Sequence, residues 1–107
     1  MKIYFAGPDV FRSSYPAFKA MVADLCCGMG LIPVFPGEEV TGSDPAAIFQ
    51  DNLALIDEAD AVVANLNPFR GPEPDSGTAF ELGYAHARGK QILGYIDRFE
   101  TTVDRVE

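Results

Sequence analysis

Short apolar runs alternate along the chain with longer segments in which apolar residues recur every three or four positions. The short runs are rich in β-branched and aromatic residues, which is typical of strands. They lie at residues 2–6, 31–35, 60–66 and 91–96. The longer segments between them predict helices, at residues 15–27, 45–59 and from the cap positions near 75 to about 88.

The order strand–helix, repeated until a last strand, predicts an α/β fold with a doubly wound parallel sheet and helices on both faces. The third strand is apolar without alternation, as expected for a strand that is covered on both sides. A length of 107 residues suits a single domain that spans residues 1–107. In such sheets ligands bind at the carboxyl ends of the strands, where the chain reverses its direction of winding.

Local signals refine these boundaries. Ser13 or Ser14 is expected to cap the first helix, and Ser43 or Asp44 the second, each shortly before a proline. Gly89 is expected to close the third helix. The apolar positions of the first helix are Phe18, Met21, Val22 and Leu25. The polar end of the chain after Ile96 predicts neither a strand nor a helix, so one edge of the sheet is expected to stay open.

Charge and composition exclude several classes of function. The net charge of −8 disfavours binding to DNA or RNA, because their phosphates would be repelled. No apolar run is long enough to cross a membrane, and the start MKIYFAG lacks the features of a signal peptide, so we expect a cytoplasmic protein. The adjacent Cys26 and Cys27 are interpreted as buried apolar residues, and one histidine does not predict a metal site.

Two carboxylates stand out in the stretch PDSGTAFELGYAHARGK. Asp75 lies in a turn, and Glu81 lies six residues later among apolar neighbours, on what reads as the buried face of a helix. A structural interpretation makes Asp75 a helix cap and either pairs Glu81 with Arg88 or turns it toward solvent. A functional interpretation places both carboxylates in the crevice formed by the loops at residues 7–14 and 67–75.

In the functional interpretation, Tyr4 donates a hydrogen bond to Glu81 from the first strand and holds the carboxylate in one orientation. A carboxylate held in this way is suited to attack a sugar carbon, while a second carboxylate handles the proton of the leaving group. The residues alone leave the structural and functional interpretations open.

The segments KIYFAGPDVF, DNLALIDEADAVVANLNPFRGPEPDSGTAFELGYAHARGK and ILGYI resemble the nucleoside 2-deoxyribosyltransferase family over residues 2–96. The resemblance implies a flavodoxin-like α/β fold that forms homodimers or larger oligomers and exchanges the base of 2′-deoxynucleosides for a free nucleobase, without a metal or an organic cofactor. It implies catalytic roles for Glu81 as nucleophile, for Asp75 at the base or its proton, and for Tyr4, which orients the nucleophile.

The resemblance also extends to residues that are expected to bind the substrate. Phe11 matches an aromatic residue that packs on the base, and Asn52 stands where some relatives carry Asp. The loop position of Arg70 allows contact with a base or a phosphate, and Gly7 and Gly77 permit close approach of the backbone to a ligand. Family members are some tens of residues longer, so their C-terminal part is expected to be missing here.

Two other functions remain open beside the transferase. One is a hydrolase that cleaves the N-glycosidic bond of 2′-deoxynucleoside 5′-monophosphates, with a phosphate held by Arg12, Ser13 and Ser14. Asp9 in the same loop would repel that phosphate, which favours the transferase. The other is a non-catalytic nucleotide-binding module, because flavodoxin-like folds host many binding domains.

Overall fold

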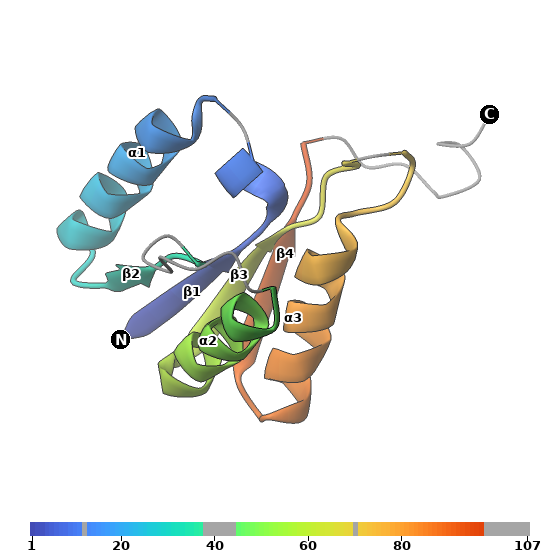
Figure 1. Ribbon diagram of the computed structural model, residues 1–107. Helices are drawn as coiled ribbons and strands as arrows, with labels where there is room; N and C mark the ends of the chain where they lie inside the picture. The colour runs from blue at the N-terminus through green and yellow to red at the C-terminus, as the bar shows by residue number, and fades with distance from the viewer. Residues whose placement is uncertain (12, 38–44, 70, 98–107) are drawn as a thin grey trace.

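The computed structural model describes residues 1–11, 13–37, 45–69 and 71–97 of the chain (Figure 1). The strands are β1 (Lys2–Ala6), β2 (Ile32–Val34), β3 (Ala61–Asn65) and β4 (Gln91–Tyr95). The helices are the short 3-10 helix η1 (Pro8–Phe11) and the α-helices α1 (Tyr15–Gly28), α2 (Pro45–Glu58) and α3 (Ser76–Ala87). The predicted order of strands and helices is therefore confirmed within the described residues.

The strands form one parallel sheet in the order β2-β1-β3-β4. The chain first winds outward from β1 to β2 and then crosses back, so that β3 lies on the other side of β1. The direction of winding therefore reverses between β1 and β3, which pair with Tyr4 opposite Val62 and Ala6 opposite Ala64. This reversal is the place where open parallel sheets bind their ligands.

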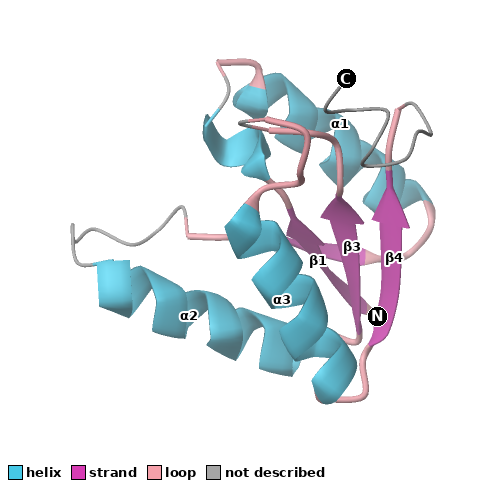
Figure 2. Ribbon diagram, turned by 90° about the vertical axis from the view of Figure 1, so that its right-hand side faces the viewer, coloured by secondary structure: helices cyan, strands magenta, loops and turns pink. Residues whose placement is uncertain are grey.

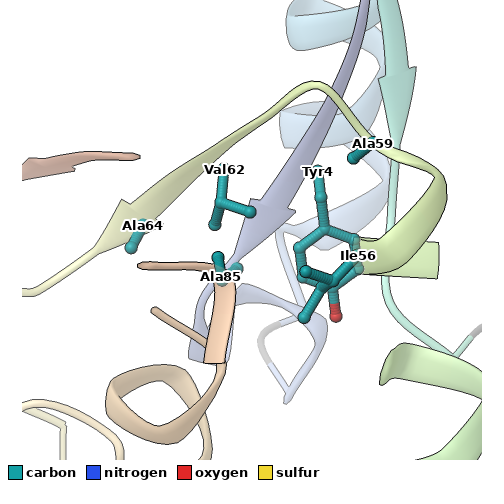
Figure 3. Close-up of a cluster of buried hydrophobic side chains, with 7 residues drawn as sticks. Tyr4, Ile56, Ala59, Val62, Ala64 and Ala85 are labelled. Carbon is teal, nitrogen blue, oxygen red and sulfur yellow. The ribbon is translucent and has the colours of Figure 1, made fainter. Parts of the chain in front are cut away.

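The helices cover both faces of the sheet, as predicted. Figure 2 shows α1 behind the sheet and both α2 and α3 in front of it. The main core lies on the α2–α3 side and is built mostly from small residues, which let the helices approach the strands closely. Its fully buried members are Tyr4, Ala6, Ile56, Ala59, Val62, Ala64 and Ala85 (Figure 3).

Helix α1 buries a narrower face than its sequence predicts. Val22 and Cys26, one turn apart, are buried, whereas Met21 and Leu25 are more than half exposed. Successive residues are turned by about 100° around a helix, so residues just before Val22 and Cys26 lie on the flank of the helix. Cys27 is exposed for the same reason, and its expected burial is wrong.

Several predicted boundaries are also corrected. Ser14 occupies the cap position of α1, but its side chain makes no capping hydrogen bond. Strand β2 is shorter than predicted, and β4 forms one edge of the sheet with all its residues exposed. The expected caps Ser43 and Asp44 lie outside the described residues.

Within the described residues, no helix is long and apolar enough to span a membrane.

Candidate active site

The loops that follow the strands are tied together at the carboxyl edge of the sheet. The buried Asn65 at the end of β3 donates from Nδ2 to both carboxylate oxygens of Asp9, at 3.1 and 3.3 Å. Its Oδ1 accepts from the amide and the side chain of Asn67, at 3.0 and 2.8 Å. Asn67 Oδ1 in turn accepts from the amide of Asp97 at 2.8 Å, beyond β4. The loops after β1, β3 and β4 are therefore joined to one another at the carboxyl edge of the sheet.

Gly7 permits the approach of the first of these loops to β3. A Cβ atom at this position would lie 2.8 Å from Asn65 Cβ and 2.8 Å from Asp9 Oδ2. Contacts this short do not occur between real side chains, so a residue larger than glycine would push the two loops apart. Glycine at position 7 is thus needed for the packing of this loop against β3, and its contact with a ligand stays a prediction.

Helix α3 follows the loop after β3 and begins with its first turn beside Asp75. Asp75 is its N-cap, and Asp75 Oδ2 accepts hydrogen bonds from the amide and from the hydroxyl of Thr78, both at 3.0 Å. This arrangement satisfies one of the free amides at the start of the helix, and the negative charge there is favourable. A Cβ at Gly77 would lie 3.2 Å from Asp75 Oδ2, so glycine leaves room for the carboxylate to fold back over the helix.

Glu81 lies nearly two turns further along α3 and is partly buried. The hydroxyl of Tyr4 donates to Glu81 Oε2 at 3.1 Å, which confirms the hydrogen bond predicted from the sequence. The Tyr4 ring is fully buried in the main core, so it fixes the position of this hydroxyl rigidly. The carboxylate is thereby held from the protein side by a donor whose ring is buried in the core.

The environment of Glu81 raises its pKa. Burial disfavours the charged carboxylate, and the nearby charge of Asp75 acts in the same direction; the hydrogen bond from Tyr4 and the amide of Asn52 oppose them. The balance sets the pKa of Glu81 to about 6, so the carboxylate is mostly ionised at neutral pH. Burial and the Glu81 charge raise the pKa of Tyr4 far above its ordinary value, which keeps its hydroxyl protonated and able to donate.

An open hollow of about 300 Å³ lies between α2 and α3, with Glu81 in its wall. This volume is at the lower end of the range for small-molecule sites. Its lining residues are Ile48, Phe49 and Asn52 of α2 and Gly77, Phe80 and Glu81 of α3. Asn52 Oδ1 is buried and has no hydrogen-bond partner within the described residues, so it can accept a hydrogen bond from a ligand.

The predicted pairing of Glu81 with Arg88 is wrong, whereas the predicted helix cap at Asp75 is confirmed. Arg88 does not pair with Glu81; its Nε donates to Asp57 Oδ1 at 3.0 Å, beside the hydroxyl of Tyr84. Seven residues of helix separate Glu81 from Arg88 by about 10 Å, so the end of α2 offers Arg88 a nearer carboxylate. Glu81 is therefore left facing Tyr4 and the hollow.

The structure brings together five of the residues singled out from the sequence: Tyr4, Asn52, Asp75, Gly77 and Glu81. Gly7 lies in the neighbouring loop, against Asn65. The side chain of Phe11 and all of Arg70 lie outside the described part of the chain.

Sequence reasoning missed Ile48, Phe49 and Phe80 in the wall of the hollow. Phe80, one of the apolar neighbours of Glu81 that the sequence places on the buried face of the helix, is half-exposed, and its ring lies 5.3 Å from that of the half-exposed Phe49, tilted by 42°. Their positions in the sequence could have indicated this role, because Phe49 lies one turn before Asn52 and Phe80 is next to Glu81.

Comparison with known proteins decides the family. The family described as nucleoside 2-deoxyribosyltransferase matches residues 3–107. A 2-deoxyribosyltransferase from Leishmania mexicana is 38% identical and superposes with a TM-score of 0.88, over 96% of this chain and 69% of that chain. The chain belongs to the nucleoside 2-deoxyribosyltransferase family. The predicted flavodoxin-like α/β fold is confirmed by the same match.

Other relatives are more distant or longer than this chain. An uncharacterized protein of Schizosaccharomyces pombe is 32% identical over 87% of this chain, which spans only 48% of that protein. A CMP N-glycosidase from Clostridium botulinum shares the fold, with a TM-score of 0.62 at 18% identity over 99% of this chain and 80% of that one. At this level of identity only the fold of the glycosidase is informative.

Proposed function

We propose that this protein transfers 2-deoxyribose between nucleobases of 2′-deoxynucleosides through a covalent intermediate on Glu81. The observation that carries the proposal is the Glu81 carboxylate, which lies in the wall of an open hollow and is held by the Tyr4 hydroxyl at 3.1 Å. Membership in the nucleoside 2-deoxyribosyltransferase family supports this assignment of the chemistry.

The reaction takes place in two balanced steps. In the first, a Glu81 oxygen forms a bond to C1′ while the bond from C1′ to the base nitrogen breaks, and Asp75, which is in its protonated form when this step begins, gives its proton to the departing base. In the second, a nitrogen of another nucleobase bonds to C1′, the ester bond to Glu81 breaks, and the proton that the new base loses returns to Asp75. The carboxylates end in their starting states, so the cycle needs no other reactant.

The electrostatics of the site suit these roles. A nucleophile must be ionised, and a Glu81 pKa of about 6 leaves the carboxylate charged at neutral pH yet more basic than an exposed glutamate. The neutral Tyr4 hydroxyl orients Glu81 and accepts no proton, so we assign it a positioning role. Asn52 supplies an amide in the hollow for hydrogen bonds to sugar or base, whereas Phe11, Arg70 and Gly7 stay predictions for base and substrate contacts.

The position of Asp9 favours free nucleosides over nucleotides. Asn65 holds the Asp9 carboxylate at the carboxyl edge of the sheet, where it would repel a 5′-phosphate. The substrates of the proposed reaction are therefore 2′-deoxynucleosides and free nucleobases, and the protein acts as a homodimer or a larger homo-oligomer, as the family resemblance implies.

A base-exchange assay tests the proposal. The protein is incubated with 2′-deoxyinosine and excess cytosine or adenine, and the products are separated by chromatography. We expect a new deoxynucleoside, formed more slowly below pH 6 as Glu81 becomes protonated. Glu81→Ala should abolish the product, whereas Glu58→Ala, a change of an exposed glutamate at the end of α2, should not.

Other products would contradict the transferase. Hypoxanthine release without a new nucleoside would indicate a hydrolase, and preferential cleavage of 5′-monophosphates would support the phosphate site at Arg12, Ser13 and Ser14. Ligand binding that survives Glu81→Ala, with no base release from any substrate, would indicate a binding module.

A further inference from the structure

The Asp75 carboxylate has two oxygens with different surroundings. Oδ2 accepts both hydrogen bonds from Thr78, and it is also the oxygen that lies above Gly77. Oδ1 accepts no hydrogen bond from any residue that the structure describes. Oδ2 therefore caps the helix, and Oδ1 is available to a ligand.

Thr78 does more in this arrangement than a cap requires. A cap needs only the backbone amide, which any residue except proline supplies at position 78. The Thr78 hydroxyl adds a second hydrogen bond to the same oxygen, and the side chain is 2% exposed, so solvent does not compete for it. Two donors to one oxygen fix the rotation of the carboxylate plane, which a single donor does not.

We propose that Thr78 is a positioning residue for Asp75: its hydroxyl fixes Oδ2 in the helix cap and so leaves Oδ1 as the oxygen that handles the proton of the base. This inference rests on the proposed function, because it assigns a support to the carboxylate that the proposed reaction uses. Proton transfer depends steeply on the position of the acid, so loosening Asp75 slows the chemical step more than it weakens substrate binding.

A pair of matched variants separates this role from simple packing. Thr78→Val keeps the shape of the side chain and removes the hydroxyl, whereas Thr78→Ser keeps the hydroxyl and removes a buried methyl group. We expect Thr78→Val to lower kcat of base exchange by about tenfold or more with KM changed by less than about twofold, and Thr78→Ser to stay within about threefold of the wild type. Thr78→Val loses a hydrogen bond and Thr78→Ser loses a buried methyl group, so the melting temperature should fall in both variants and should not follow kcat.

The opposite result overturns the inference. If Thr78 acts only by packing, activity follows stability and Thr78→Ser is the more impaired variant. A rise in KM with unchanged kcat would also contradict the proposal, because it would show a lost binding contact. Gly77→Ala approaches the same oxygen from the other side, at 3.2 Å, and should lower kcat as well; it decides the question if Thr78→Val does not fold.

A second measurement does not depend on activity. NMR three-bond couplings report whether the Asp75 side chain occupies one χ1 rotamer or several. We expect one rotamer in the wild type and in Thr78→Ser, and averaging in Thr78→Val. A single rotamer in all three proteins would overturn the inference, whether or not the protein exchanges bases. If Thr78→Val shows rotamer averaging but the wild type exchanges no bases, only the proposed function is contradicted.

Discussion

At the scale of single residues, the site is built around one carboxylate that the fold makes costly to ionise. Glu81 is buried enough to raise its pKa to about 6, and the Tyr4 hydroxyl only partly compensates for the lost hydration. The structural alternative, in which Glu81 pairs with Arg88, would have relieved this cost, but Arg88 binds Asp57 instead. A destabilising charge held in a hollow is a common feature of functional sites.

The raised pKa predicts how Glu81→Gln changes stability with pH. The folded protein binds the Glu81 proton more tightly than the unfolded chain does, because the pKa is about 6 when folded against an ordinary value of 4.5. This contribution to stability is present below pH 4.5 and is lost as the pH rises through 6. Glutamine cannot ionise, so Glu81→Gln should raise the free energy of unfolding at pH 8 by about 2 kcal/mol.

Urea unfolding at pH 8 and at pH 4.5 measures this effect. The two proteins should differ at pH 8 and come much closer at pH 4.5, because Glu81 is then protonated in the folded protein and about half ionised in the unfolded chain. Glu58→Gln removes an exposed carboxylate of the same kind and serves as the control. A variant that is less stable than the wild type at pH 8 would show that the Tyr4 hydrogen bond outweighs the burial of the charge.

At the scale of elements, the loops at the carboxyl edge of the sheet are joined to one another by hydrogen bonds. Asn65 at the end of β3 holds Asp9, and Asn67 holds the chain that follows β4. These hydrogen bonds join segments that are up to 56 residues apart in the sequence. The loop after β1 carries Phe11, so its attachment to β3 determines where the proposed base-binding segment begins.

Gly7→Ala tests this attachment. The added methyl group would lie 2.8 Å from Asn65 Cβ, an atom of a fixed strand, so the loop has to move away from β3. We expect a loss of about 1–3 kcal/mol in the free energy of unfolding, measured by urea titration. Gly28→Ala, at the end of α1, places its methyl group where there is nothing within 4 Å and should be neutral or slightly stabilising. Equal stabilities for the two variants would contradict the close packing at Gly7.

At the scale of the whole molecule, the described sheet leaves apolar surface uncovered. All residues of β4 are exposed, among them Leu93 at 63%, and α1 exposes Met21 and Leu25 on its flank. Exposed apolar surface of this extent is typical of association. The resemblance to the family implies a dimer or a larger oligomer. We propose such an assembly for this protein.

Light scattering coupled to size-exclusion chromatography tests the assembly. We expect a mass of at least twice the 11.6 kDa of one chain, with little dissociation on dilution through the micromolar range. A monomer at every concentration would contradict the proposed oligomer while leaving the chemistry of Glu81 to be judged by the base-exchange assay.

The sequence by itself determined the class of fold and pointed to the chemistry that we propose. The spacing of apolar residues predicted the strands and helices. An element buries one face only if its apolar residues recur with the period of that element. The pair Asp75 and Glu81, together with the resemblance of the segments around them, was sufficient to predict a carboxylate site at the carboxyl edge of the sheet. Local patterns carry this information because each depends on neighbouring residues only.

Only the tertiary structure decided which residues meet at the site and which partner each charge takes. Tyr4 and Glu81 are 77 positions apart, and the choice of Asp57 by Arg88 depends on how α2 packs beside α3. The same packing exposes Phe49 and Phe80 in the hollow, although each reads as an ordinary apolar residue in its helix. Such contacts depend on distances between elements, which the periodicity of a single segment does not contain.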